Sequence, residues 1–134
     1  MRYYIKSGIW DFKKRGTPGE LDLSKVVNST PSRTQNITSA ATVTPNSSSE
    51  DMVIISNQVS ALLLAAPTGT PSEGQGLLIR IYSDGAYAIT YDSIYRVVGV
   101  TLPTTTIAGK TQYIACIYNL ADTKWDVIGV REQI

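Results

Sequence analysis

Residues 74–130 read GQGLLIRIYSDGAYAITYDSIYRVVGVTLPTTTIAGKTQYIACIYNLADTKWDVIGV, and the rest of the chain is interpreted from this stretch. Apolar and aromatic residues recur there in short runs that Gly, Pro, Asn or Asp close, which is typical of strands and turns. Within each run, alternate side chains point to opposite faces of a sheet. The stretch therefore predicts a β structure built from hairpins.

Two hairpins are predicted within this stretch. Asp84-Gly85 separates the runs 77–82 and 86–91, and Gly85 accepts the positive φ that a tight hairpin turn needs. The second hairpin pairs 111–118 with 124–130 across a polar loop that is short enough for neighbouring antiparallel strands.

Further strands are predicted at 36–43, 52–57, 59–66 and 95–102, the last of which ends before Pro103 because proline cannot donate to a ladder. About eight short strands and no helix longer than one turn predict an all-β fold, a jelly-roll-like antiparallel β-sandwich. Alternation predicts the following buried residues: Ile54, Leu63, Ile79, Ile89, Val98, Ile114 and Val127.

The chain is divided into an extended N-terminal arm or anchor, residues 1–30, and the sandwich domain, residues 31–134. The arm holds aromatic residues beside a basic triplet, and such residue types dominate interface energetics. The candidate partner-binding residues are Tyr3, Tyr4, Trp10, Phe12, Lys13, Lys14 and Arg15. The alternative is an edge strand that folds back on its own domain, with lysines that protect the edge.

Charge is sparse and balanced. Lys and Arg number 12 and Asp and Glu 11 in 134 residues, a net charge of +1. A dedicated nucleic-acid binder has a basic face or stripe, so no specific nucleic acid is expected. Charged residues make up only 17% of the chain. A surface short of charge suits packing against other copies, although many all-β proteins share this composition.

The sequence offers little chemistry. Histidine is absent, which excludes nucleophilic sites with a histidine base, and the single Cys116 is typical of a small buried hydrophobe. The pairs Asp84/Asp92 and Asp122/Asp126 lie near turns, where aspartate more often bonds its own backbone than serves catalysis or Ca²⁺. We expect no enzyme activity, metal or cofactor.

No apolar run approaches the ~20 residues that span a bilayer, and the first residues lack the apolar core of a signal peptide. We therefore expect no membrane partner and synthesis in the host cytoplasm.

The segments GLLIRIYSDGAYAITYDSIYR, VGVTLPTTTIAGKTQYIACIYN and KWDVIGV resemble a β module of tailed-bacteriophage structural proteins, over residues 66–134. The resemblance implies a virion protein that binds the major capsid protein or another virion protein. The first expectation is a capsid decoration (cement) protein on the capsid exterior, because neither heptads nor collagen-like repeats provide a fibre shaft. The alternative is a receptor- or glycan-binding component of a tail or head fibre.

The module also carries most of the tyrosines, which predicts either packing in the core and between subunits or stacking on a glycan. Resemblance to trimeric virion parts and low surface charge together predict a homotrimer. The hypothetical anchors of the subunit interface are Tyr91, Tyr95 and Trp125.

Overall fold

Nine strands make up the part of the chain that the structure, a computed structural model, describes, residues 33–134. The strands are β1 (Thr34–Ile37), β2 (Thr42–Val43), β3 (Met52–Gln58), β4 (Leu62–Leu64), β5 (Gly76–Ser83), β6 (Ile89–Tyr91), β7 (Tyr95–Val97), β8 (Lys110–Asn119) and β9 (Lys124–Glu132). The described residues belong to one unit, Ser32–Ile134, so the predicted arm 1–30 lies outside them.

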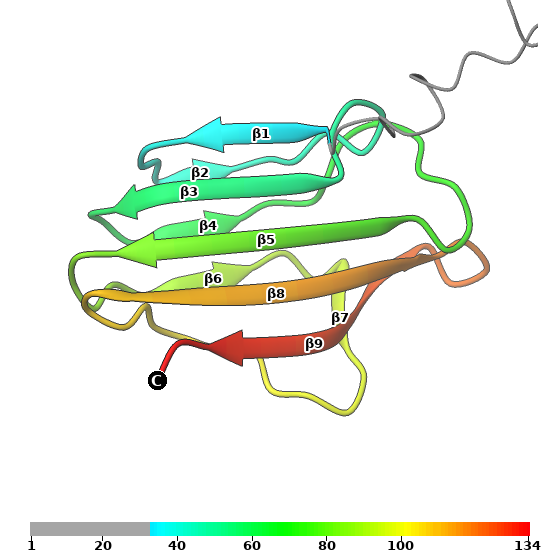
Figure 1. Cartoon of the computed structure of the whole chain (residues 1–134). Coiled ribbons are helices and arrows are strands. Elements are labelled where there is room, and N and C mark those ends of the chain that lie inside the picture. The colour runs from blue at the N-terminus through cyan, green and yellow to red at the C-terminus, as the bar shows by residue number, and fades with distance from the viewer. Residues whose placement is uncertain (1–32) are drawn as a thin grey trace, which may run out of the picture. The chain divides into compact units, whose positions relative to one another are not determined.

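The strands form two sheets, one behind the other (Figure 1). The six-stranded sheet has the order β1-β3-β5-β8-β9-β7, and the three-stranded sheet has the order β2-β4-β6. In Figure 1, β1, β3 and β5 run one way in front, and β2, β4 and β6 run the opposite way behind. The chain from β1 to β6 therefore winds as a coil of three turns, each of which adds one strand to each sheet. The coil is right-handed, the sense that parallel crossover connections favour.

The all-β prediction is confirmed, since the described residues contain no helix and about half of them lie in strands. The predicted antiparallel arrangement is wrong, because five of the seven strand pairings are parallel. Each strand of the coil returns to its own sheet only after the chain has crossed the other one, so neighbours run in the same direction. A jelly-roll order, which requires antiparallel neighbours, is not confirmed.

The predicted hairpin at Asp84-Gly85 is wrong. β5 already pairs with β3 on one side and β8 on the other, so no edge remains for β6, which pairs with β4 in the other sheet. The turn instead carries the chain between sheets, and Gly85 does not have a positive φ. Ser83 fixes this crossing, because its Oγ lies 2.7 Å from Gln58 O and 2.7 Å from Gly85 O.

The C-terminal hairpin is confirmed. β8 and β9 pair antiparallel from Asn119↔Lys124 to Gln112↔Glu132, with a bulge at Ile128. Two other predicted strands are altered: 36–43 is divided between β1 and β2 in different sheets, and 95–102 is reduced to β7. β7 pairs parallel to β9 over three residues.

The core lies between the two sheets and is apolar. Its buried hydrophobic residues are Val43, Val53, Ile55, Leu62, Leu64, Leu77, Ile79, Ile81, Ile89, Tyr95, Ile114, Cys116, Tyr118, Trp125 and Val127. Four of the seven predicted core residues are confirmed: Ile79, Ile89, Ile114 and Val127.

The other three are corrections. Ile54 is half-buried, Leu63 points outward between the buried Leu62 and Leu64, and Val98 follows the end of β7 and is exposed. Apolar residues occupy successive positions in these runs, so alternation alone did not fix which of them face the core.

Buried polar side chains hold the corners of the coil. Gln58 is fully buried at the end of β3, and its Nε2 donates to Ala40 O (2.7 Å) and Ser60 O (2.8 Å). Its Oε1 accepts from Ala40 N and from Ser39 Oγ, both at 3.2 Å. One side chain thus ties the β1–β2 connection of one turn to the β3–β4 connection of the next.

Cys116 is expected to be inert in the folded protein. Its side chain is buried in β8, and burial raises the pKa of the thiol to about 12. Because the thiolate is the reactive form, we expect a chromogenic disulfide reagent at pH 8 to modify the native chain at least about 100-fold more slowly than the chain in guanidinium chloride. The absorbance of the released thiol measures both rates. Equal rates would contradict the burial of this strand.

Candidate interaction surface

Two of the three residues predicted as subunit anchors belong to the core of a single chain. Trp125 is 1% exposed and packs on Tyr118, with ring centroids 5.1 Å apart. Tyr95 is also buried, its hydroxyl donates to Ala65 O (2.9 Å), and burial raises the pKa of the phenol. Neither side chain is available to a second copy in this fold, so the prediction is wrong for both.

Tyr91, the third predicted anchor, is half-buried against the core, and its hydroxyl donates to Pro103 O (2.7 Å). The predicted partner-binding residues of the arm lie outside the described part of the chain: Tyr3, Tyr4, Trp10, Phe12, Lys13, Lys14 and Arg15. That hypothesis stays a prediction.

The aspartates of the terminal hairpin form a clamp with Arg96 of β7. Arg96 Nε donates to Asp126 Oδ1 (2.7 Å), and its Nη2 lies 3.0 Å from Asp122 Oδ2. Hydrogen bonds from Arg96 hold the pKa of the Asp126 carboxyl below its ordinary value. Asp92 caps its own turn by accepting from Ile94 N (2.9 Å), as turn aspartates do. The Asp92 contact stabilises the turn before β7, and the Arg96 contacts hold β7 against the terminal hairpin.

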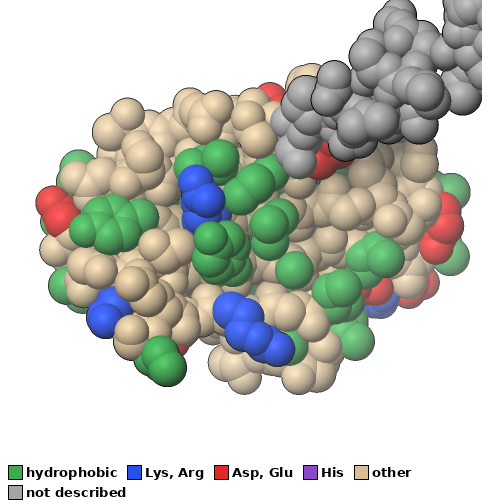
Figure 2. Space-filling model, viewed as in Figure 1, with side chains coloured by type: hydrophobic (Ala, Val, Ile, Leu, Met, Phe, Trp, Pro, Cys, Tyr) green, Lys and Arg blue, Asp and Glu red, His purple; other side chains and the backbone are tan. Residues whose placement is uncertain are grey.

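The side of the six-stranded sheet that points away from the three-stranded sheet is the broadest candidate surface. Its residues alternate along β3, β5 and β8 with the buried core residues. We call it the outer face, and it consists of Met52, Ile54, Leu78, Arg80, Tyr82, Tyr113, Ala115, Ile117, Gly129 and Arg131. Figure 2 shows this side of the molecule, with apolar side chains gathered around basic ones.

Strand register brings these residues together from distant parts of the chain. Met52, Leu78, Ala115 and Gly129 form one cross-strand row, which is apolar throughout. Large apolar side chains remain partly open to solvent around it: Tyr82 is 37%, Tyr113 36% and Ile117 37% exposed. Contiguous exposed apolar surface of this kind marks interaction sites in soluble proteins.

The next row carries charge. Arg80 pairs with Tyr113, and Tyr113 pairs with Arg131, so the three residues are neighbours across β5, β8 and β9. Neither arginine forms a salt bridge within residues 33–134. Asp126, the cross-strand partner of Ile117, forms a salt bridge with Arg96. The outer face is therefore cationic, although residues 33–134 hold six basic and eight acidic side chains, a net charge of −2.

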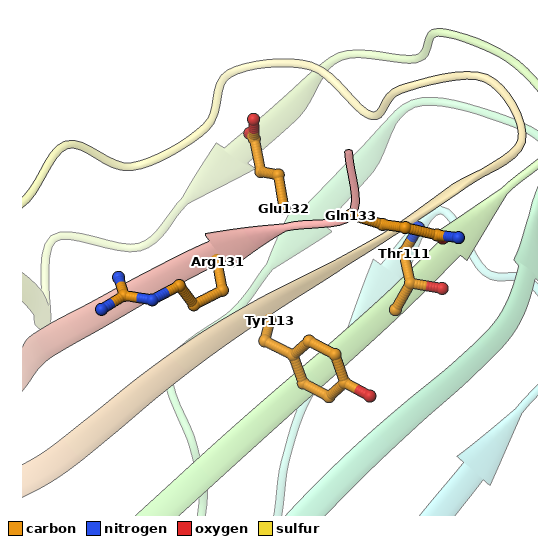
Figure 3. A pocket seen from close by; sticks show the side chains of 5 residues that line it. All are labelled: Thr111, Tyr113, Arg131, Glu132 and Gln133. Carbon is orange, nitrogen blue, oxygen red and sulfur yellow. The ribbon is translucent and has the colours of Figure 1, made fainter.

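A shallow hollow of about 400 Å³ lies at one end of the outer face, beside the ends of β8 and β9 (Figure 3). Thr111, Tyr113 and Arg131 line it on the outer side, whereas Glu132 points to the opposite side of the sheet. There the Glu132 carboxylate accepts from Gln112 Nε2 (2.9 Å). An aromatic ring, a guanidinium and a hydroxyl are groups that can stack on a sugar and bind an acidic substituent.

Within residues 33–134 no group of three His, Cys, Asp or Glu side chains is placed to hold a metal ion. The same residues include no helix that is long and apolar enough to cross a membrane.

Sequence reasoning missed the outer face as a unit. The one local sign of an apolar outer face was that the predicted strand 52–57 has apolar residues on both of its sides. This pattern does not show which side the rest of the domain covers. The Arg80–Tyr113–Arg131 row joins three strands that are far apart in sequence, and no spacing along the chain indicates it.

Comparison with known proteins gives no family. No protein-family model matches the chain, and no curated protein matches it either. A solved structure described as a chaperone-substrate complex aligns with 73% of this chain at 14% identity and a TM-score of 0.42. The alignment spans 16% of the chain in that structure, and similarity at this level carries no argument about function.

Proposed function

We propose that the protein is a structural component of a tailed-bacteriophage particle, of the fibre type. The resemblance of residues 66–134 to virion modules supports the particle, and the coil supports the fibre type. A coil of parallel turns adds its strands along one axis, as solenoid proteins do.

The capsid decoration protein, which was the first expectation from the sequence, remains the version that places the chain on the capsid exterior. No feature of residues 33–134 favours it specifically.

Glycan binding is a second candidate activity within the same role. The hollow beside Tyr113 and Arg131 favours it, since both side chains lie on the outer side and Arg131 has no carboxylate partner within residues 33–134. The ligand chemistry that suits these groups is a saccharide with a carboxylate or phosphate substituent.

Gold-labelled antibody against the chain, viewed by electron microscopy on particles of the phage that encodes it, tests the proposal. We expect label on fibres or at the tail, and none on particles from a deletion mutant of this gene. Label spread over the capsid shell would support the decoration version instead. Particles that never carry label, together with free protein in the lysate, would refute a virion role.

A further inference from the structure

We propose that the outer face binds a linear acidic polysaccharide, which lies across β5, β8 and β9 instead of occupying the hollow as a single sugar. This ligand class deepens the glycan binding proposed above, on which it rests. It gives that activity a footprint larger than the hollow and a direction across the strands.

The footprint consists of two adjacent cross-strand rows, which we call the tyrosine–arginine patch. One row is Arg80, Tyr113 and Arg131, and the other is Tyr82, Thr111 and Gln133. Tyr113 and Arg131 rise from neighbouring strands on the outer side (Figure 3). The hollow covers only part of the patch, since Arg80 and Tyr82 do not line it.

The domain leaves the binding groups of this patch largely unused. Within residues 33–134, neither arginine has a carboxylate partner, and the hydroxyl groups of Tyr82 and Tyr113 form no hydrogen bond. Gln133 accepts from Thr111 N through its Oε1 (3.0 Å), which leaves the amide NH2 for a ligand. Because paired strands hold these groups, they are already in position to bind.

The two tyrosines offer aromatic surface for more than one sugar. Tyr82 lies opposite Thr111, so Tyr113, two residues further along β8, is its diagonal neighbour at about 7–8 Å. The two side chains are 37% and 36% exposed. An amphipathic ring of this kind packs against the apolar face of a sugar and bonds a sugar hydroxyl through its own.

The spacing of the arginines favours a polymer. Arg80 and Arg131 flank Tyr113 in register, two strand spacings or about 10 Å apart. One sugar unit is about as long as one strand spacing, so a single sugar reaches only one guanidinium group. A chain with an acidic group on every unit, or on alternate units, reaches both. Each guanidinium then binds one acidic group with two parallel hydrogen bonds.

The balance of charge favours a polysaccharide over a nucleic acid. Nucleic-acid binding draws most of its affinity from many Lys and Arg contacts to phosphates. Residues 33–134 hold six basic and eight acidic side chains, a net charge of −2, so such contacts are few. The neutral groups of the patch, by contrast, suit the hydroxyl groups of a sugar chain: Tyr82, Thr111, Tyr113 and Gln133.

Isothermal titration calorimetry of the full chain with short polygalacturonate fragments tests the ligand class. We expect binding that weakens at high salt. Fully methyl-esterified fragments, which carry no charge, should bind at least about 10-fold more weakly, because hydrogen bonds to charged groups are lost. Equal binding of the methyl ester or of oligothymidylate would overturn an acidic polysaccharide as the ligand. No binding of polygalacturonate would also overturn it, while antibody label on the particle would still support the virion role.

A matched pair of variants locates the charge contact. Arg131→Gln and Arg33→Gln each remove one positive charge, and Arg33 lies before β1, outside the patch, where it pairs with Asp51. We expect Arg131→Gln to bind polygalacturonate at least about 10-fold more weakly and Arg33→Gln to bind like the wild type. Equal losses in the two variants would show that net charge, and not the patch, determines binding.

Tyr82→Ala and Arg80→Gln test the extension beyond the hollow. Each is expected to weaken binding of polygalacturonate several-fold, with an unchanged circular dichroism spectrum because neither side chain belongs to the core. Wild-type affinity in both, together with lost binding in Tyr113→Ala, would confine the ligand to the hollow. That result would overturn the extended chain and leave glycan binding itself intact.

Discussion

Gln58→Leu is expected to destabilise the folded chain by about 2–4 kcal/mol, although leucine fills a similar volume. Leucine cannot form the hydrogen bonds that the Gln58 amide makes with Ala40 N, Ala40 O and Ser60 O at the corner of the coil. A backbone group left without a partner at a partly buried site costs about 1–3 kcal/mol. Because the corner is partly open, water replaces some of these hydrogen bonds. The total loss of stability is therefore smaller than three times the cost of one unpaired backbone group.

Gln112→Leu is the matched control. Gln112 is equally buried, but only its Nε2 is bonded, to Thr105 O (3.2 Å) and Glu132 Oε2, and its Oε1 has no partner within residues 33–134. Leucine there removes an unsatisfied oxygen together with two bonds, so the expected loss is about 1 kcal/mol or less. Urea unfolding at equal protein concentration measures both values. Equal losses would show that burial, and not the hydrogen bonds of the corner, determines the cost.

Gly69→Ala is the second substitution with a large expected effect, about 2–4 kcal/mol. Gly69 has a φ of 88°, and a Cβ atom there would lie 2.8 Å from Ser48 N and 2.6 Å from Ser48 Oγ. The left-handed backbone costs about 1–2 kcal/mol for a residue with a side chain. The rest comes from separating the loop 66–75 from the loop 44–51 of the preceding turn. These loops are held by Ser47 N→Thr68 O (2.9 Å) and Thr70 N→Ser48 Oγ (3.1 Å).

Gly99→Ala separates the two contributions. Gly99 also has a positive φ, 71°, but an added Cβ meets no atom within 4 Å. Gly99→Ala should therefore lower the free energy of unfolding only by the cost of the left-handed backbone, about 1–2 kcal/mol. For a domain of about 100 residues, each kcal/mol lowers the thermal midpoint by about 4–8 °C, so scanning calorimetry resolves the difference. If both variants melted together, contact between the two loops would contribute nothing to stability.

Local patterns predicted what local contacts determine. The β8–β9 hairpin was predicted because its two runs alternate cleanly and a short polar loop joins them, and the structure has it at nearly the predicted bounds. The β5 core residues followed from the same alternation, as Ile79 shows. In each case the information lies within one strand or between two adjacent ones.

The coil could not be predicted in the same way. Parallel pairing joins Thr34 to Met52 and Met52 to Leu78, residues 18 and 26 positions apart, and no turn motif announces such a partner. Asp84-Gly85 shows the limit most clearly, since a turn signal tells that the chain bends but not which sheet it enters next. Tyr95 and Trp125 were predicted as subunit anchors, but whether a chain covers its own aromatic residues depends on segments elsewhere in the sequence, such as Ala65, whose carbonyl binds the Tyr95 hydroxyl.

The order of strands in the six-stranded sheet also favours an order of folding. β8 and β9 meet across a short loop and can pair within microseconds, and their hairpin offers β5 its antiparallel edge. The parallel pairings of β3 with β1 and with β5 close longer stretches of chain, and such non-local pairings form more slowly. Assembly is therefore expected to begin at the C-terminal hairpin, which is synthesised after the coil. On the ribosome, β5 is then expected to lack its antiparallel partner until β8 and β9 have emerged.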